Sequence, residues 1–454
     1  MLVEERGLSS RATQEVARTG KLGNLSIPLT VQKLQRALQA KAKENPSFRF
    51  YALYDKLYRE DILQHAFACC KANKGAAGVD EQGFEDIEAY GRELWLGELA
   101  QELREKKYQP QAVRRVFIPK RGGQGQRPLG IPSIRDRTVQ MAAVLVLGPI
   151  FEADLQPEQH AYRPERNALT AVSEVHSLLN TGHTQIVDAD LAAYFDSIPH
   201  EQLLKSVARR VVEPAMLHLI KMWLQAPVEE TDERGKKKRT TRNRDEGRGI
   251  PQGSPLSPLL SNIYMRRFVL GWKLLGHARR YNAHIVNYAD DLVICCKVNA
   301  AKALEAMREV MDRLGLTVNE EKTHVCRAAE QHFDFLGYTF GRCYSFKTGQ
   351  AYFGTRPSKK SIRRQVESIR EKTARQRCGL AAGVVVKELN EGLRGWANYF
   401  KLGPVGTSYR AIDTYATRRL RRWLCRKHKV RGSGWSRYPN GYLYQQLGLV
   451  RLPH

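Results

Sequence analysis

The sequence HIVNYADDLVICC occupies residues 284–296 and decides the fold more than any other stretch. Apolar residues flank a pair of acids, Asp290 and Asp291, so the stretch predicts two strands joined by a tight turn. Adjacent carboxylates repel each other, and a divalent cation would relieve that repulsion. The alternative is an ordinary hairpin turn, where aspartate is common. The pair therefore becomes informative only together with further acids.

A second predicted strand also ends in carboxylates. Residues 186–196 read IVDADLAAYFD, with Asp190 at the end of the apolar run. If this strand lies beside the hairpin, Asp190 faces Asp290 and Asp291. Three carboxylates at one sheet end form a two-metal site, with the ions about 3.5–4 Å apart. The backbone carbonyl of Leu191 could supply a further oxygen, and such an all-oxygen site suits two Mg²⁺ ions.

Two other acids compete for this role. Asp188 should point to the same face as Asp190 by strand alternation, but about 7 Å further back. Asp196 lies beyond the strand, and we assign it a structural role. The prediction is therefore that Asp190, Asp290 and Asp291 are the catalytic acids.

The bulk composition points to a polyanionic partner. The 454-residue chain carries a formal net charge of +27 and has a pI of about 9.8. Lys and Arg side chains that neutralise phosphates release counterions from nucleic acid, whereas an enzyme of small metabolites has no use for this excess. A basic ribosome-associated factor is the alternative. Without a run of about 18 apolar residues or an apolar signal segment, we expect no membrane partner and a cytoplasmic location, in a bacterium or an organelle.

The cysteines argue against a zinc module, because none forms a C-x-x-C pair. Two adjacent pairs lie in apolar runs, where cysteine behaves as a small hydrophobe. We expect all eight to be reduced, namely Cys69, Cys70, Cys295, Cys296, Cys326, Cys343, Cys378 and Cys425.

Periodicity predicts the order of helices and strands. Helices are expected over residues 31–72, 134–151, 200–224, 257–275 and 301–314, and strands over 113–118, 127–131, 184–191 and 284–287. The first two strands enclose a turn rich in cations, which predicts a basic hairpin. Residues 235–244 are expected to form a basic, mobile loop.

The C-terminal region changes in composition. Residues 356–431 hold 21 Lys and Arg against 5 Asp and Glu. Within it, one face of a predicted helix is apolar, with Ile412, Tyr415, Ala416, Leu420, Trp423 and Leu424. The other face carries Arg418, Arg419, Arg421, Arg422 and Arg426. The pattern predicts a basic helical module after the catalytic body.

The tetrapeptide YADD at 288–291 is similar to the signature of reverse transcriptases. In that family the partner acid stands five residues before an aromatic, as Asp190 stands before Phe195. The resemblance implies that Phe195 excludes a ribose 2′-hydroxyl and so selects deoxynucleotides. A buried core phenylalanine is the alternative.

Two further segments resemble the same family. Residues 249–258, GIPQGSPLSP, predict a shaped loop before a helix, in which Gln252 can hydrogen-bond near the nucleotide or the template. A simple helix-entry turn is the alternative. Residues 333–338, FDFLGY, resemble the primer-grip strand.

Three cations receive roles from the resemblance. Lys120 and Arg127 of the basic hairpin would grip the incoming triphosphate, and arginine suits bidentate phosphate contact. Lys322, in the motif at 314–323, could donate a proton to pyrophosphate. Solvated surface cations are the alternative for all three.

Other motifs resemble the group II intron-encoded reverse transcriptase and maturase family. They are NKGAAGVD at 73–80, HAYRP at 160–164 and GWANYF at 395–400, the last within the basic helices that resemble the thumb or maturase domain. HAYRP departs from the usual YGFRP at its first three positions, which affects placement in a subfamily rather than the chemistry. The sequence lacks the Cys/His cluster of the family's DNA endonuclease domain, and about 23 residues follow the thumb. An intron enzyme of this kind would depend on a nicked or single-stranded primer.

The predicted fold is α+β, a right-hand polymerase with α+β fingers, an antiparallel-sheet palm and an α-helical thumb. The expected divisions are residues 1–175 (N-terminal extension and fingers), 176–345 (palm), 346–431 (thumb or maturase domain) and 432–454 (short basic tail). The predicted function is an RNA-directed DNA polymerase of a group II intron that also binds intron RNA for splicing and retrohoming.

The expected partners are an RNA template, intron RNA, a DNA primer or target and deoxynucleoside triphosphates; the sequence does not fix the oligomeric state. Two alternatives stay open. One is a free-standing, domesticated reverse transcriptase in defence or repair, and the other is an RNA-binding splicing factor with an idle polymerase. An RNA-dependent RNA polymerase is a minor further option.

Overall fold

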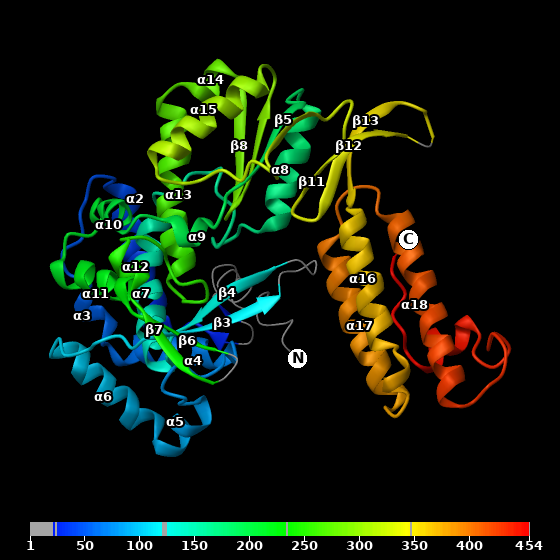
Figure 1. Cartoon of the computed structure of the whole chain (residues 1–454), viewed down its shortest axis with the longest axis horizontal. Helices are drawn as coiled ribbons and strands as arrows, with labels where there is room; N and C mark the ends of the chain where they lie inside the picture. Colours follow the sequence, from blue (N-terminus) through cyan, green and yellow to red (C-terminus); the bar gives the residue numbers. More distant parts are fainter. Residues whose placement is uncertain (1–20, 23–24, 120–124, 233–234, 346, 454) are drawn as a thin grey trace.

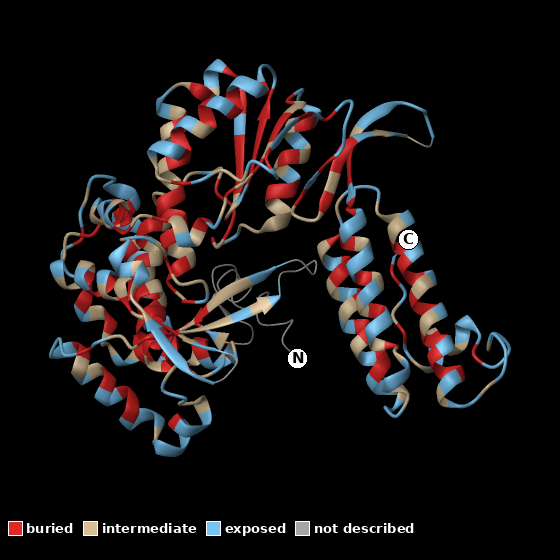
Figure 2. Ribbon diagram, viewed as in Figure 1, coloured by how far each residue is buried: buried red, intermediate tan, exposed pale blue. Residues whose placement is uncertain are grey.

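The computed structural model describes residues 21–22, 25–119, 125–232, 235–345 and 347–453 (Figure 1). Lys120 lies outside these residues. The described elements build two apolar cores, one formed by residues between Ile27 and Leu316 and one that joins the central sheet to the C-terminal helices. Buried residues follow the strands of this sheet and the inner faces of the helices (Figure 2).

The N-terminal helices surround one apolar helix, α7 (Ile134–Glu152). This helix is buried along most of its length, because it is apolar around its whole circumference. Packed against it or beside it are α2 (Leu29–Glu44), α3 (Tyr54–Leu57), α4 (Glu60–Ala72), α5 (Phe84–Tyr90) and α6 (Arg92–Arg104). A short pair of strands, β1 (Lys21–Leu22) and β2 (Leu25–Ser26), precedes them.

A four-stranded sheet carries the predicted basic hairpin. Its order is β4 (Gln126–Ile131), β3 (Val113–Pro119), β6 (Val228–Thr231) and β7 (Lys237–Thr240). The basic loop expected at 235–244 is therefore wrong, since β7 and α12 (Arg242–Asp245) occupy most of it. Arg239 Nε lies 2.8 Å from Glu229 Oε2 on the opposite strand, and this cross-strand pair stabilises the strand.

The central sheet is antiparallel, in the order β10 (His324–Arg327), β5 (Gln185–Asp190), β9 (Asp291–Cys296) and β8 (Ala283–Tyr288). Because side chains alternate along a strand, its two faces enter different cores. Val187, Leu292 and Ile294 belong to the first core, which includes α13 (Ser257–Leu274) and α15 (Ala300–Arg313). Ile186 and Val293 belong to the second core, with α8 (Ala168–Asn180) and the C-terminal helices.

A three-stranded sheet connects the central sheet to the C-terminal helices. It consists of β11 (Phe333–Phe335), β12 (Tyr338–Tyr344) and β13 (Ala351–Pro357). The helices α16 (Lys359–Lys372), α17 (Ala382–Tyr399) and α18 (Gly406–Lys427) then lie side by side (Figure 1), with the short helix η1 (Arg375–Arg377) between the first two and η2 (Tyr442–Gln446) after the last. Tyr399 Oη donates to the Leu336 carbonyl at 2.7 Å, which ties α17 to the connecting sheet.

Two long helices expected from periodicity are interrupted. The helix expected over residues 31–72 breaks after α2, and that over 200–224 divides into α10 (His200–Ala208) and α11 (Pro214–Gln225). A buried side chain contacts the end of α2, and Pro214 opens α11. The Arg210 guanidinium donates to the carbonyls of Ala42 at 2.6 Å and of Asn45 at 3.0 Å, and these end α2. Such satisfaction of terminal carbonyls by a distant arginine cannot be deduced from helical spacing.

The remaining elements are the short helices α9 (Tyr194–Ser197) and α14 (His277–Arg280). The single helices expected over 134–151, 257–275 and 301–314 are confirmed by α7, α13 and α15. All eight cysteines are free thiols, as expected. No helix within the described ranges is both long and apolar enough to cross a lipid bilayer.

Candidate active site

Asp190 and Asp291 lie directly opposite each other at one end of the central sheet. They are register partners of the neighbouring strands β5 and β9, and Tyr288 of β8 is the next residue across. Ala289 and Asp290 form the two-residue turn between β8 and β9. Ala289 has a φ of 59°, a left-handed conformation that tight hairpin turns require.

Asn287 fixes this turn from beneath. It is buried, and its Nδ2 donates to the Ala289 carbonyl at 2.9 Å. Its backbone carbonyl accepts from the amide of His160 at 2.9 Å. The Asn287 side chain and the HAYRP segment therefore hold the turn together.

The electrostatics of the sheet end disfavour several negative charges at once. Burial, followed by the charges of Asp290, Asp190 and Asp188, raises the pKa of Asp291 to about 7. Burial is also the main cause that raises the pKa of Asp290, and that of Asp188 to about 6. The Asp291 side chain is in contact with solvent, but protein surrounds it on most sides, so water screens the repulsion only in part.

The donor set fits a divalent cation in chemistry, since it offers carboxylate oxygens whose mutual repulsion a cation would relieve. Among the residues that the structure describes, however, no three His, Cys, Asp or Glu side chains converge closely enough to hold a metal ion. The Asp190 side chain has other partners: its Oδ2 lies 2.9 Å from Lys322 Nζ and 3.1 Å from Asn319 Nδ2. A cation held by Asp190 Oδ2 would therefore compete with Lys322.

Lys322 forms an ion pair with a predicted catalytic acid, Asp190, while its side chain stays 64% exposed. Its expected role as a proton donor to pyrophosphate stays a prediction. The segment that carries Lys322 is fixed to β5, because the Asn319 amide donates to the Asp190 carbonyl at 2.8 Å.

Leu191 lies in an isolated bridge to Val318. The Ala192 amide donates to Thr317, and the Asp190 carbonyl accepts from Asn319, so the bridge does not use the Leu191 carbonyl. The side chain is buried. The Leu191 carbonyl oxygen thus accepts no hydrogen bond from this bridge.

Phe195 and Gln252 meet through a pair of adjoining loops. The Phe195 carbonyl accepts from the Ile250 amide at 2.8 Å, which joins α9 to the GIPQG loop. The Phe195 ring is partly buried against the first core rather than fully enclosed. Gln252 Nε2 donates to Asp196 Oδ2 at 3.3 Å, so Asp196 positions the glutamine, in agreement with its expected structural role.

The GIPQG loop packs tightly on the basic hairpin. The Gly130 amide of β4 donates to the Gln252 carbonyl at 2.7 Å. A Cβ on Gly253 would approach the Gly130 carbonyl oxygen to 2.5 Å, and Gly253 has a φ of 122°. Only glycine allows this approach and this backbone conformation.

Arg127 of the same hairpin faces the acids. Burial raises the pKa of Asp290, and the Arg127 charge acts in the opposite direction. The Arg127 charge also opposes the rise in the pKa of Asp196 that burial causes. The structure therefore brings Arg127 towards the predicted catalytic acids, whereas Lys120 lies outside the described residues.

Tyr162 was not among the candidate site residues. Burial and then the Asp290 charge raise its pKa, which indicates that the phenol lies near that acid. Its φ of 56° turns the chain at this point. Tyr162 belongs to the HAYRP motif, which indicated the family but not a position near Asp290.

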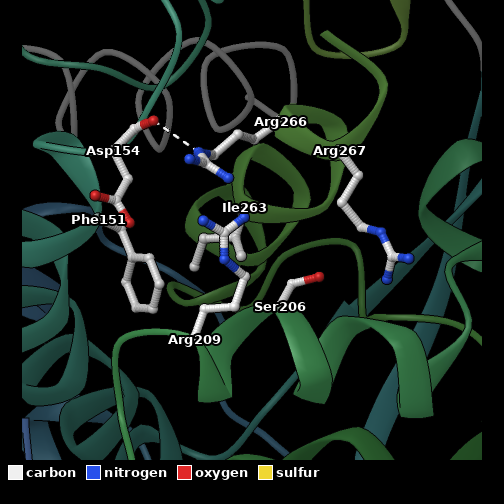
Figure 3. Close-up of a pocket in the computed structure, with 7 residues that line it drawn as sticks. All are labelled: Phe151, Asp154, Ser206, Arg209, Ile263, Arg266 and Arg267. Atoms are coloured by element: carbon white, nitrogen blue, oxygen red, sulfur yellow. Dashed lines mark hydrogen bonds between the residues drawn. The ribbon is translucent and has the colours of Figure 1, made fainter. Parts of the chain in front are cut away.

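A separate cavity of about 20 Å³ lies away from these acids and has room for about one water molecule (Figure 3). Its lining is Phe151, Asp154, Ser206, Arg209, Ile263, Arg266 and Arg267. The Arg266 Nε donates to the Asp154 carbonyl at 2.7 Å. The cavity is too small for a nucleotide.

Comparison with known families identifies both halves of the chain. A family model described as reverse transcriptase (RNA-dependent DNA polymerase) matches residues 118–340. A second, described as group II intron, maturase-specific domain, matches residues 362–440. The chain belongs to the group II intron reverse transcriptase and maturase family. It therefore contains an RNA-dependent DNA polymerase domain, and the predicted family, fold class and enzyme class are confirmed.

Individual relatives agree with this assignment. The chain is 32% identical over 349 residues to protein YkfC of Escherichia coli, a match that covers 68% of this chain and 88% of that protein. It is 32% identical over 249 residues to the group II intron-encoded protein LtrA of Lactococcus lactis, covering 54% of this chain and 39% of LtrA. A retron Mx65 reverse transcriptase of Myxococcus xanthus is 27% identical over 46% of this chain and 47% of its own length.

Membership implies catalysis with divalent metal ions, and nucleic-acid and nucleotide substrates. The match to LtrA spans well under half of that protein. Roles of this chain in splicing and retrohoming are therefore proposed below.

Proposed function

We propose that this protein copies RNA into DNA for a group II intron and binds the intron RNA to assist splicing and retrohoming. The observation that carries the proposal is that Asp190 pairs with Asp291 at one end of the central sheet. One face of this sheet packs in the same apolar core as the C-terminal helices. Polymerisation and RNA binding would then act from one connected body.

The proposed catalytic residues are Asp190, Asp290 and Asp291, which would hold two Mg²⁺ ions together with the Leu191 carbonyl. When bound, the two ions supply activation of the primer 3′-hydroxyl and stabilisation of the leaving pyrophosphate. The raised pKa of Asp291, at about 7, supports a cation site here, since burial and then the neighbouring carboxylates oppose its ionisation and a cation would favour it.

The proposed nucleotide contacts surround these acids. Arg127 and Lys120 would bind the triphosphate, and the Phe195 ring would close the space beside the sugar C2′. Gln252, held by Asp196, would hydrogen-bond near the nucleotide or template. Lys322 would leave Asp190 when cations bind and would then be free to donate a proton to pyrophosphate.

The proposed RNA-binding half is the basic C-terminal module. Residues 356–431 carry 21 Lys and Arg against 5 acids, an excess suited to phosphate neutralisation. An RNA-binding factor with an idle polymerase is the competing function, but nothing in folding favours opposed acids such as Asp190 and Asp291.

Primer extension on an RNA template, with deoxynucleotides and Mg²⁺, tests the polymerase. Native protein should extend the primer, and Asp290→Asn, which keeps the size of the side chain, should not. Equal extension by the variant would remove Asp290 from the site. No extension by either protein, with intact RNA binding, would favour the idle-polymerase function.

A free-standing reverse transcriptase is the second candidate, and the similarity to the retron enzyme favours it. Its catalytic residues would be the same. Sequencing the DNA around the gene distinguishes the two, because only an intron-borne enzyme is flanked by intron RNA domains.

A further inference from the structure

The end of the chain combines an exposed aromatic ring with uncompensated positive charge. From residue 414 to 454 the sequence holds ten Lys and Arg and no Asp or Glu. Of the six tryptophans, all of them described, five are buried and Trp435 is 55% exposed. Burying an exposed indole against a partner would be favourable, so this ring needs an explanation.

The Trp435 ring is held in a defined orientation. The Arg421 guanidinium carbon lies 3.7 Å from the ring centroid, which covers one face of the indole. Arg421 was expected on the exposed face of its helix, and this is wrong: it is buried, and it donates to the Tyr438 carbonyl at 2.8 Å and to Asn440 Oδ1 at 2.6 Å. Arg421 is thus a fixed support for the ring.

The backbone before Trp435 is fixed as well. Gly434 has a φ of 73°, and a Cβ there would collide with the Cys425 Sγ. This close approach holds the loop against α18, beside Arg421. The second face of the indole is therefore exposed on a rigid base rather than on a free loop.

The cations of α18 divide into two groups. Arg419 Nε donates to Thr373 Oγ1 at 3.0 Å and Lys427 Nζ to the Cys378 carbonyl at 3.1 Å, so both fix α18 to its neighbours. Arg418, Arg422 and Arg426 are exposed, and none of them pairs with a carboxylate in the part of the chain that the structure describes. Their spacing of four residues forms a stripe along one face of the helix.

The stripe begins next to the support of the ring. Arg418 precedes Arg421 by three residues and is therefore its neighbour on the helix surface, while Arg422 and Arg426 continue the stripe further round the helix. The charges also repel within α18, since Arg426 and Arg422 add to burial in lowering the pKa of Arg419. A row of phosphates along the stripe would relieve this repulsion.

We propose that Trp435 stacks an unpaired base of RNA while Arg418, Arg422 and Arg426 contact the phosphates of the same strand. This rests on the proposed binding of RNA and names the element recognised, a single-stranded segment rather than a duplex. A duplex does not offer a free base face, whereas aromatic platforms flanked by cations bind single strands of any sequence.

The test uses the full chain with short polyadenylate RNA and with an RNA hairpin of matched length. Because Trp435 is the one exposed tryptophan, stacking should quench the part of the intrinsic fluorescence that acrylamide also quenches. Trp435→Ala should weaken binding of the single strand about tenfold or more, and leave the hairpin affinity unchanged. Trp435→Phe keeps a ring and should retain most of the affinity.

A triple variant, Arg418→Gln, Arg422→Gln and Arg426→Gln, should have a slope of log Kd against log salt concentration that is smaller by about two. Each phosphate contact on a single strand contributes about 0.7 to this slope. Wild-type affinity of Trp435→Ala for the single strand would overturn the proposal, as would equal losses on strand and hairpin. Primer extension by the wild type on an annealed template is measured alongside. If the wild type itself extends no primer, the polymerase proposal fails while the binding result stands.

Discussion

Lys322 and a divalent cation would compete for the same carboxylate. The Lys322 Nζ lies 2.9 Å from Asp190 Oδ2, and the lysine side chain is mostly exposed. Lys322→Gln should lower the Mg²⁺ concentration that gives half-maximal extension, by up to about fivefold, since exposed pairs contribute at most about 1 kcal/mol. A titration of extension rate with Mg²⁺ measures this. Lys322→Arg keeps the cation and serves as control; an unchanged or higher Mg²⁺ requirement in Lys322→Gln contradicts the competition.

The Phe195 ring is partly buried, so it has one side available to the nucleotide. Phe195→Ala should reduce discrimination against ribonucleotides by about tenfold or more, within the range that apolar contact provides. The ratio of kcat/KM for deoxy- and ribonucleotides measures it. Phe195→Tyr keeps the ring and should keep the discrimination. If Phe195→Ala rejects ribonucleotides as the wild type does, the phenylalanine belongs to the core alone.

Arg210 should be among the residues most important for stability. It is buried, its Nε lies 3.3 Å from Asp154 Oδ2, and its guanidinium donates to carbonyls at the end of α2. Arg210→Met removes the buried guanidinium from the partly buried Asp154 and from these carbonyls, so we expect a loss of about 3 kcal/mol. Urea unfolding followed by fluorescence measures the change. Arg209→Met, at the exposed neighbour, should cost less than about 0.5 kcal/mol.

The meeting of the candidate acids could be predicted from the sequence because their signal is local: Asp290 and Asp291 adjoin one turn, and Asp190 ends one strand. The ion pair of Lys322 could not, because it depends on a segment more than a hundred residues further along the chain. Tyr162 was missed for the same reason. Its approach to Asp290 follows from the packing of HAYRP on β8, not from its own motif.

At the scale of elements, glycine in the GIPQG loop should be required for activity. Gly253→Ala would bring a Cβ to 2.5 Å from the Gly130 carbonyl and strain a φ of 122°. The loop should shift, and with it Gln252, so extension should fall while RNA binding remains. Gly395→Ala is the matched control, since its Cβ meets nothing within 4 Å in α17 and should stabilise the helix by up to about 1 kcal/mol. Equal extension by both variants contradicts the requirement.

Sequence periodicity predicted the elements whose signal lies within them. Strands β5, β8 and β9 and helices α7, α13 and α15 follow from their own apolar patterns. It did not predict β7, whose basic residues are satisfied by Glu229 on the opposite strand. The end of α2 is contacted by Arg210, which is distant from α2 in sequence and adjacent to it in space.

At the scale of the whole molecule, the C-terminal helices and the central sheet should unfold together. They share the second core, in which Tyr338 of β12 packs on Tyr399 and Phe400 at the end of α17. A chain truncated after Pro357 should expose this core, bind an apolar dye and lose its cooperative unfolding transition. A folded, monomeric truncation product would show instead that the two parts are independent.

This coupling affects how RNA binding should be tested. Deleting residues 356–431 removes the basic module and also uncovers apolar surface in the second core, so a loss of binding would have two explanations. Substitutions of exposed arginines avoid this problem, because surface changes seldom alter stability by more than about 0.5 kcal/mol.

The two faces of the central sheet also provide a pair of chemical reporters. Cys295 and Cys296 are adjacent on β9 and both buried, yet the first belongs to the core shared with the C-terminal helices and the second to the first core, which includes α7, α13 and α15. A thiol reacts with an alkylating agent only when its surroundings open. Pulsed alkylation during partial unfolding, followed by mass spectrometry, would therefore measure how fast each core opens, with two neighbouring residues of one strand as the reporters.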